Sequence, residues 1–355
     1  MILFNAWPAL WRMSLLALAL LAGLGLVQPA LAQSDPDAEI ATAVPAINAD
    51  AWRQVRSGET GPNYRDSRFD SNYNLINAGG ETWRQIRNRW VSPFGLIAIG
   101  AMLVMITLFY LVFGRKDLDE PRTGRKLLRW TVLERSLHWT VATLFIVLAL
   151  TGLNLLYGKF VFRPLFGDAF WAGMMSGTKV LHNYLGPLFG ALLIIILAKF
   201  LMRNLPKKGD WAWFKQGGGL IGKGRHPDAG FANGGEKVWY WLLATAGLAV
   251  IASGLVLDFP NYGQSRDTMQ WANIVHAVGA LGLTAVALGH IYIGTLGTEG
   301  SLEGMATGYV DETWAKEHHN LWYEQVKDQA IDADQVAARS RPGPDDSAPA
   351  GERTS

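Results

Sequence analysis

Five long runs without a charged side chain constrain this chain more than any other feature of its sequence. They cover residues 91–113, 136–158, 180–198, 238–257 and 268–298. Each run is close to or above the ~20 residues that a helix needs to cross the hydrocarbon of a bilayer. Charged residues make up only 17% of the 355 positions, well below the usual level of about a quarter in soluble domains. The sequence therefore predicts an all-α integral membrane protein with five membrane-spanning helices.

The N-terminal segment, residues 1–32, is typical of a secretory signal peptide. Arg12 carries its only charge, an apolar run follows at 15–27, and Ala30 and Ala32 form an A-x-A cleavage pattern. The alternative is an anchor helix that is not cleaved. In both cases residue 33 lies on the outer side of the membrane.

Two polar segments lie outside the apolar runs. Residues 33–90 form an extension in which Trp52-Arg53-Gln54-Val55-Arg56 is echoed by Trp83-Arg84-Gln85-Ile86-Arg87, and this pattern favours two short amphipathic helices. Residues 333–355 are rich in Ala, Pro, Asp, Ser and Arg without periodicity, which predicts a disordered tail. Neither segment shows a catalytic pattern.

The loops predict the orientation of the helices. Basic residues are concentrated after the first run and after the third run, and are sparse in the alternate loops. The positive-inside rule places the basic loops in the cytoplasm of a bacterial inner membrane. The mature N-terminus is then periplasmic and the C-terminus cytoplasmic. The basic residues of the loop after the first run are Arg115, Lys116, Arg122, Arg125, Lys126 and Arg129. Those of the loop after the third run are Arg203, Lys207, Lys208, Lys215, Lys223, Arg225 and Lys237.

The chain contains no cysteine and seven histidines. The lack of cysteine excludes disulfides, c-type haem attachment and thiolate-bound iron–sulfur clusters within this chain. A net charge of +2 gives no support to nucleic-acid binding. Any redox metal in the chain must therefore be held by histidine.

His276 and His290 lie on the fifth predicted helix, 14 residues apart. At ~1.5 Å per residue this spacing is ~21 Å along the helix axis, and the accumulated turn of ~1400° brings both to the same side. Two metal centres at different depths in the bilayer would need this arrangement.

The predicted topology supplies a partner for each of these two histidines. His182 opens the third helix at the periplasmic face, where His276 also lies. His138 opens the second helix at the cytoplasmic face. His290 lies at the same face, at the far end of the fifth helix. Two imidazoles at each depth predict two haem b groups, each with both axial positions filled, which favours electron transfer over oxygen binding. The ligand pairs are His182 with His276, and His138 with His290.

Small residues surround these histidines and permit close approach of a flat macrocycle, although each is equally compatible with tight helix–helix packing. The other histidines, His226, His318 and His319, lie in predicted cytoplasmic segments and are interpreted as surface or interface residues. The small residues are Gly152, Gly186, Gly190, Gly279, Ala280 and Gly282.

Several motifs resemble one family of membrane cytochromes. The most specific is Trp314-Ala315-Lys316-Glu317-His318-His319 followed by Trp322-Tyr323. With the other motifs, residues 125–325 resemble the gamma, or cytochrome b, subunit of respiratory formate dehydrogenase. The other motifs are Arg135-Ser136-Leu137-His138-Trp139-Thr140, Leu181-His182, Gly186-Pro187-Leu188-Phe189-Gly190, Val275-His276-Ala277, His290-Ile291-Tyr292 and Gly300-Ser301-Leu302-Glu303-Gly304-Met305.

The resemblance implies a four-helix dihaem cytochrome b bundle, to which this chain adds the helix at 91–113. In that family a pterin-containing alpha subunit oxidises formate, and an iron–sulfur beta subunit passes electrons to the periplasmic haem. The cytoplasmic haem then reduces quinone. The family's quinone site lies at an Asn-x-Gly turn, which here is Asn233 to Gly235, although the same residues are typical of a helix N-cap.

Two other functions remain open on the sequence. The nearest is the cytochrome b subunit of a nickel–iron hydrogenase or of a thiosulfate or polysulfide reductase, which shares the helical core and its histidines. The second is a haem-free transporter or anchor, but transporters place ionisable residues near the middle of the membrane. The apolar runs of this chain contain no Asp, Glu, Lys or Arg.

Overall fold

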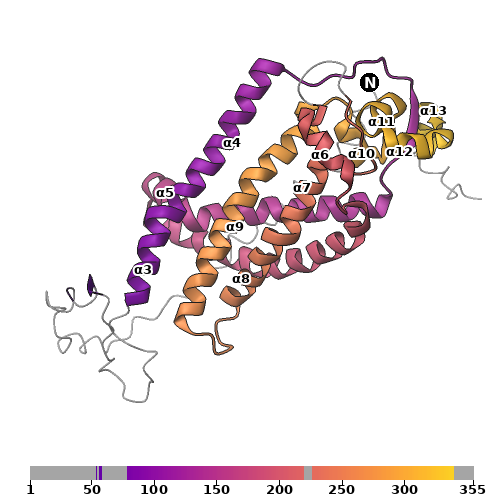
Figure 1. The fold of residues 1–355 in the computed structure, drawn as a ribbon. Coiled ribbons are helices and arrows are strands. Elements are labelled where there is room, and N and C mark those ends of the chain that lie inside the picture. The colour runs from indigo at the N-terminus through magenta and orange to yellow at the C-terminus, as the bar shows by residue number, and fades with distance from the viewer. Residues whose placement is uncertain (1–52, 54–55, 58–77, 220–225, 340–355) are drawn as a thin grey trace, which may run out of the picture. The chain divides into compact units, whose positions relative to one another are not determined.

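The computed structural model describes residues 53, 56–57, 78–219 and 226–339, so the predicted signal peptide and most of the polar extension lie outside the described residues (Figure 1). The chain divides into two compact units, and each is described by itself. The first unit takes in residues up to Ile106 together with His138–Lys199 and Leu242–Gly289, and the second takes in Thr107–Leu137, Phe200–Trp241 and the chain from His290 onward.

Four helical stretches of the described chain are long and apolar enough to span a membrane. Their large apolar side chains face outward. In α4 (Ser92–Phe113), for example, Ile97 and Leu111 are 69% and 73% exposed. These helices satisfy their backbone hydrogen bonds internally and expose large apolar side chains. Such a structure is suited to a lipid bilayer and not to water. The four stretches are Gly79–Phe113, Val132–Arg203, Gly234–Asp258 and Arg266–Gly297.

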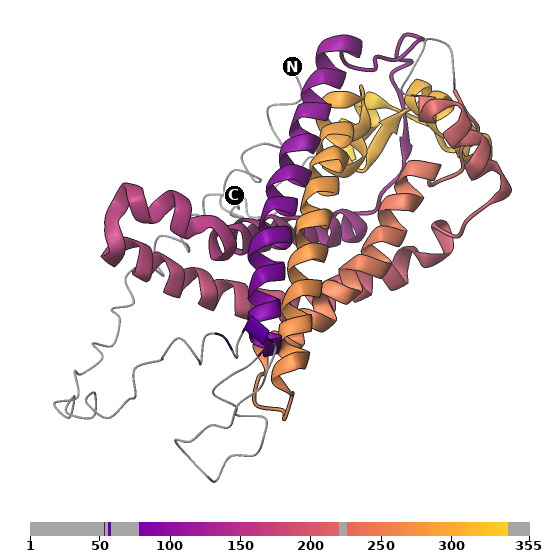
Figure 2. The same ribbon diagram turned by 60° about the vertical axis from the view of Figure 1, so that its left-hand side comes forward.

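The longest helix, α5 (Val132–Phe200), folds back on itself. Gly167 has φ 82° and ψ 173°, a conformation that only glycine adopts without strain. On either side of it the two arms lie against each other: Asn154 Nδ2 donates to Thr178 Oγ1 at 2.7 Å, and the Phe145 and Phe189 ring centres are 6.2 Å apart. Figure 2 shows the two arms side by side.

The hairpin in α5 accounts for the difference between five predicted spans and four long helices. The predicted runs at 136–158 and 180–198 lie one on each arm, and the helix continues through the segment between them. The all-α membrane fold is therefore confirmed. The remaining spans are α7 (Gly234–Leu242), η6 (Leu243–Gly247) and α8 (Leu248–Asp258), then α9 (Arg266–Tyr292) with η7 (Ile293–Gly297).

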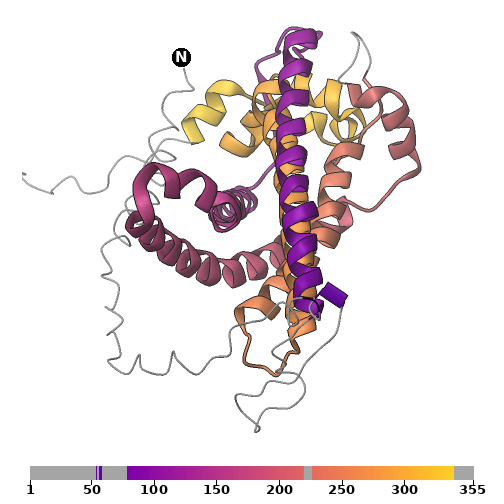
Figure 3. The ribbon, with the colours of Figure 1, turned by 90° about the vertical axis from the view of Figure 1, so that its left-hand side faces the viewer.

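The additional N-terminal helix packs closely on the first unit. α3 (Ala78–Ile86) continues through η3 (Arg87–Val91) into α4. The N-terminal part of α4, which belongs to this unit, lies along α9 (Figures 2 and 3). A Cβ atom at Gly95 would lie 2.4 Å from Tyr157 Oη and 2.7 Å from Leu281. The Tyr157 hydroxyl also donates to the carbonyl of Ser92 at 2.6 Å. Glycine at 95 is thus what lets α4 reach its neighbours.

The second unit contains a small antiparallel sheet with strand order β2-β1-β3, which the sequence analysis did not predict. Strand β1 (Arg125–Leu128) pairs with β2 (Tyr309–Asp311) and with β3 (Ile331–Asp332). The strands and their covering helices enclose an apolar core of Leu127, Val310, Trp314, Ala315 and Trp322. The helices of this unit include α6 (Lys208–Lys215), α10 (Ser301–Thr307), α11 (Glu312–His318) and α12 (Asn320–Val326), with short η4 (Leu201–Arg203), η5 (Gly217–Gly219) and η8 (Lys327–Gln329).

A buried cation organises this core. The side chain of Arg129 is 2% exposed, and its guanidinium pairs with Glu236 at 3.1 Å and donates to the carbonyl of Phe231 at 3.0 Å. Burial lowers the pKa of Arg129, and the glutamate opposes that effect. Aromatic faces surround the charge and offset part of the desolvation. The ring centres, 4.9–5.6 Å from the guanidinium carbon, are those of Trp130, Phe231, Trp314 and Trp322.

The segment predicted to be a disordered tail begins with ordered structure. Residues Ala333–Arg339 form the short helix α13, which follows β3 directly, and residues 340–355 lie outside the described chain. Alanine and arginine favour a helix, so local propensity supports this short element. The second copy of the repeated motif, at 83–87, spans the end of α3 and the start of η3, as expected for an amphipathic helix.

The close approach at Gly95 predicts that Gly95→Val will destabilise the protein by roughly 1–3 kcal/mol, because the added atoms collide with Tyr157 and Leu281. The matched control is Gly100→Val on the same helix, where a Cβ atom meets no described atom within 4 Å. Thermal unfolding of both variants in the same detergent measures the difference. Equal transition temperatures would contradict the described packing.

Candidate functional site

A cavity of about 420 Å³ lies within the first unit. Its walls come from both arms of α5, from η6 and α8, and from α9, and two of the predicted ligands, His182 and His276, face it. Most of its lining is apolar or small, which is typical of a site for a large, flat, mainly apolar group. The small residues of the lining are Ala149, Gly152, Gly186, Gly247, Gly254, Ala277 and Ala280.

The sequence allowed two roles for the small residues near the histidines: room for a flat macrocycle, or close helix–helix packing. The structure shows which residues line the cavity and which pack helices together. Gly152, Gly186 and Ala280 line the cavity. Gly190 and Gly279 instead serve helix packing, since a Cβ atom at either position would come within 3 Å of an isoleucine or valine side chain on α8. Gly282 has no described neighbour within 4 Å of such an atom.

The ring of His182 is held by a neighbouring threonine. Its Nδ1 lies 2.8 Å from Thr151 Oγ1 on the other arm of α5. The Thr151 hydroxyl proton is directed to the carbonyls of Val147 and Leu148, at 2.8 and 3.1 Å. The hydroxyl oxygen therefore accepts from Nδ1–H, which assigns the lone pair of His182 to Nε2.

The ring of His276 is held by the backbone. Its Nδ1 lies 2.9 Å from the carbonyl oxygen of Val250 on α8, and because a carbonyl only accepts, Nδ1 carries the proton. A Cβ atom at Gly254 would lie 3.0 Å from Cε1 of this ring, so the glycine makes room for it. Nε2 of His276 is thus also left with its lone pair.

The two imidazole rings face one cavity with their ring centres 6.1 Å apart. Two imidazoles that bind one metal from opposite sides hold their ring centres roughly 6 Å apart, since each nitrogen–metal bond is about 2 Å and each ring centre lies about 1 Å behind its nitrogen. The spacing, the two Nε2 lone pairs and the mainly apolar cavity together fit a metalloporphyrin held by two histidines.

Charged residues are few in this cavity. Arg87 of η3 and Lys179 of α5 contribute cationic side chains to its lining, and Asp258 contributes one carboxylate. Arg87 belongs to the segment that the sequence analysis treated as an extension without chemistry. The structure therefore brings a residue of that extension to the candidate site.

The other two predicted ligands fall in different units. His138, in the first unit, has its ring 5.2 Å from that of Trp139. His290, in the second unit, stacks on Trp239 of α7 with ring centres 5.2 Å apart and planes 14° apart. The pairing of His138 with His290 stays a prediction. Sequence reasoning missed Trp239, because an aromatic residue in an apolar run carries no signal of its own.

Asn233 and Gly235, the predicted quinone residues, are found at the start of α7. Asn233 Oδ1 accepts from the backbone N–H of Glu236, and the Glu236 carboxylate accepts from the N–H of Asn233, both at 2.9 Å. This reciprocal pair is a capping box. A Cβ atom at Gly235 would lie 3.1 Å from Trp213. The capping role is thus established by geometry, and the quinone role stays a prediction.

His319 corrects one expectation from the sequence, since it is not a surface residue. Its side chain is 1% exposed, and its Nδ1 donates to the carbonyl of Gly230 at 2.8 Å. Burial lowers the pKa of His319 well below its usual value, so the ring is neutral at pH 7. The hydrogen bond from His319 therefore connects the segment before α7 with the end of α11.

The long apolar helices define a multi-pass integral membrane protein, and two histidines face the apolar cavity of its first unit. A family model described as prokaryotic cytochrome b561 matches residues 129–308, slightly more than half of the chain. The chain therefore belongs to the prokaryotic cytochrome b561 family, and haem b binding follows from that membership.

Curated relatives agree with the resemblance predicted from the motifs. The cytochrome b556(fdo) subunit of formate dehydrogenase from Escherichia coli K12 is 28% identical over 207 residues, which cover 57% of this chain and 93% of the relative. The nitrate-inducible cytochrome b556(Fdn) subunit from the same strain is 26% identical over 212 residues, 58% of this chain and 93% of its own length. The cytochrome b556 subunit of Haemophilus influenzae formate dehydrogenase is 25% identical over 214 residues, 58% and 86%.

The close contact between Gly254 and the ring of His276 predicts that a larger residue at position 254 reduces haem binding. Gly254→Ala places a methyl group against the imidazole and displaces it, so we expect less haem b per chain and a lower unfolding temperature. Gly282→Ala, where the methyl group meets no described atom, is the matched control. The pyridine haemochrome assay measures the haem. Equal haem content in the two variants would contradict the described position of the ring.

Proposed function

We propose that this chain is the dihaem electron-transfer subunit of a membrane-bound formate dehydrogenase and passes electrons to membrane quinone. The observation that carries the proposal is the pair of histidines in the apolar cavity, with their Nδ1 atoms occupied and their ring centres 6.1 Å apart. The names of the relatives supply the enzyme, since all three are formate dehydrogenase cytochrome b subunits.

The first haem b is held by His182 and His276 through Nε2. When bound, haem iron with two axial imidazoles supplies reversible one-electron transfer. The chain fixes both rings through Thr151 and the Val250 carbonyl, and its apolar lining keeps water from the iron. With both axial positions filled by protein, oxygen has no open coordination site.

The second haem b is held by His138 and His290. The support for this proposal is the unbroken course of α9 from Arg266 to Tyr292, which keeps His276 and His290 on one face and ~21 Å apart along the axis. The stacking of Trp239 on His290 also fixes the plane of that ring. Two groups on one helix then form a path between the two faces of the membrane.

The direction of electron flow follows from the loop charges. In the inner membrane, with the mature N-terminus periplasmic and the C-terminus cytoplasmic, the haem of His182 and His276 is the periplasmic one. A partner iron–sulfur beta subunit delivers electrons there. Formate oxidation belongs to a pterin-containing alpha subunit, as in the family that the motifs resemble, since this chain has no cysteine for a cluster and shows no pterin-binding pattern. Quinone is reduced on the cytoplasmic side, where we assign Asn233 and Gly235 to its site.

Substitution of each ligand tests the dihaem arrangement. The wild-type chain is expected to hold two haem b groups, and His182→Ala, His276→Ala, His138→Ala and His290→Ala one each, because one axial bond does not retain the group. In the first two variants the haem that remains is the cytoplasmic one, so electrons from formate no longer reach it. The pyridine haemochrome assay and formate-to-quinone activity of the purified complex measure both effects. Unchanged haem content in any one variant would exclude that histidine as a ligand.

The position of Arg87 in the cavity lining predicts that the N-terminal extension affects the midpoint potential of the first haem. A cationic side chain at the haem cavity favours the reduced haem, which carries one positive charge fewer, so Arg87→Gln is expected to lower the midpoint potential of the first haem by roughly 30–60 mV. The matched control is Arg84→Gln, one turn earlier, where the arginine pairs with Glu81 and does not line the cavity. Potentiometric titration measures the shift. Equal potentials in both variants would contradict the role of Arg87.

A further inference from the structure

A cluster of two histidines and two carboxylates lies in the second unit, apart from the haem ligands. Nε2 of His226 lies 2.8 Å from Oδ2 of Asp119. The ligating atoms of Asp119, His226 and Glu317 all lie within 4.8 Å of one another. A single metal ion between them could reach all three with small side-chain movements, because metal–ligand bonds to nitrogen and oxygen are about 2 Å.

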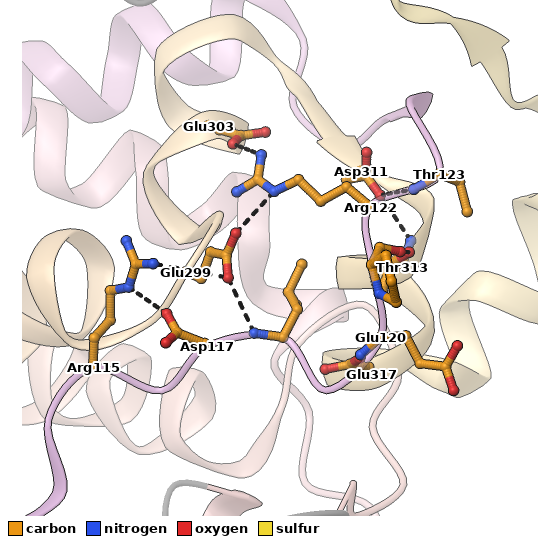
Figure 4. A network of polar contacts seen from close by, with 12 residues as sticks. Arg115, Asp117, Glu120, Arg122, Thr123, Glu299, Glu303, Asp311, Thr313 and Glu317 are labelled. Carbon is orange, nitrogen blue, oxygen red and sulfur yellow. Dashed lines mark hydrogen bonds and ion pairs between the residues drawn. The ribbon is translucent and has the colours of Figure 1, made fainter.

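The carboxylate of Glu317 is fixed in place by the backbone. It is buried at the last turn of α11 and accepts from the N–H groups of Asp119, at 3.0 and 3.1 Å, and of Glu120, at 2.9 Å. Figure 4 shows this side chain beneath the loop that carries Glu120. Oε1 accepts from both N–H groups, whereas Oε2 accepts from Asp119 alone and keeps a lone pair. Glu317 is thus oriented by neutral donors, with acceptor capacity left for a cation.

A small polar cavity of about 20 Å³ adjoins these side chains, and a second histidine lines it. His226, Glu317 and His318 all contribute to its wall. Nε2 of His318 is buried and has no hydrogen-bond partner among the described residues. An unpartnered buried polar atom is costly, and a cavity of this size holds one water molecule or one ion. This arrangement points to a ligand for that nitrogen.

The ring of His318 is prepared for such a role. It packs against Trp314, with ring centres 5.3 Å apart. Two cationic side chains, Lys116 and Arg129, are close to His318. Lys116 Nζ lies 3.2 Å from Oδ1 of Asp119 and so engages the oxygen that His226 does not contact.

We propose that Asp119, His226 and Glu317 form a structural zinc site, and that His318, whose nitrogens lie outside the group of atoms within 4.8 Å, completes it through its buried Nε2 after a movement of its ring. Two imidazole nitrogens and two carboxylate oxygens satisfy the four-coordinate preference of Zn²⁺, whereas Mg²⁺ and Ca²⁺ prefer oxygen ligands alone. Binding replaces the contact between His226 and Asp119, and the neutral ring then carries its one proton on Nδ1 and binds the ion through Nε2. The ion joins the loop after α4, the segment before α7 and the end of α11.

The test is the zinc content of the purified full-length protein with its haems bound. After dialysis against one equivalent of ZnCl₂ and desalting, inductively coupled plasma mass spectrometry is expected to find one zinc per chain. His226→Ala and His318→Gln are expected to lower this value at least tenfold, because each removes a nitrogen ligand. Asp117→Asn, which alters an exposed carboxylate two residues from the site that pairs with Arg115, keeps full zinc content.

Haem content of the same samples separates the loss of zinc from a failure to fold, since a folded variant retains haem b. Zinc is also expected to raise the unfolding temperature of the wild type and of Asp117→Asn, and to leave that of His318→Gln unchanged. Less than a tenth of an equivalent in the wild type would overturn the proposal. Equal zinc in folded His226→Ala, His318→Gln and wild type would overturn it as well.

Discussion

The hydrogen bonds of two Nδ1 atoms are the constraint on which the first unit depends. In an apolar cavity each imidazole must place its N–H on an acceptor, because an unpartnered buried donor is costly. Thr151 and the carbonyl of Val250 provide these acceptors, and both choices leave the lone pair of Nε2 available for a metal. The same bonds join the two arms of α5 and tie α8 to α9. Helix packing and the orientation of the metal ligands are therefore one arrangement.

Glycine makes that arrangement possible at the places where backbones or rings approach closely. Gly167 turns α5 so that Thr151 meets His182, and Gly254 admits the ring of His276. Gly95 lets α4 lie against Tyr157, which brings the neighbouring η3, with Arg87, to the cavity. The additional helix is thus a part of the haem-binding unit and not only an anchor.

The sequence predicted what depends on local pattern. Uninterrupted apolar runs gave the membrane helices, and the spacing of His276 and His290 on one helix gave a common face. It missed what depends on contacts between distant segments: the sheet of β1, β2 and β3, the aromatic surroundings of Arg129, and the stacking of Trp239 on His290. His319 is a further case, since its burial depends on Gly230, 89 positions away. Polar residues in loops carry no signal of the partner that will bury them.

The central claim is that this chain binds haem b through two axial histidines at each of two sites. Near-infrared magnetic circular dichroism of the oxidised protein reads the axial ligands directly, since the energy of the charge-transfer band depends on their identity. We predict low-spin ferric haem with bis-imidazole ligation, of an intensity that corresponds to two haems per chain. A high-spin signal, a band typical of histidine with methionine, or the intensity of a single haem would contradict the account.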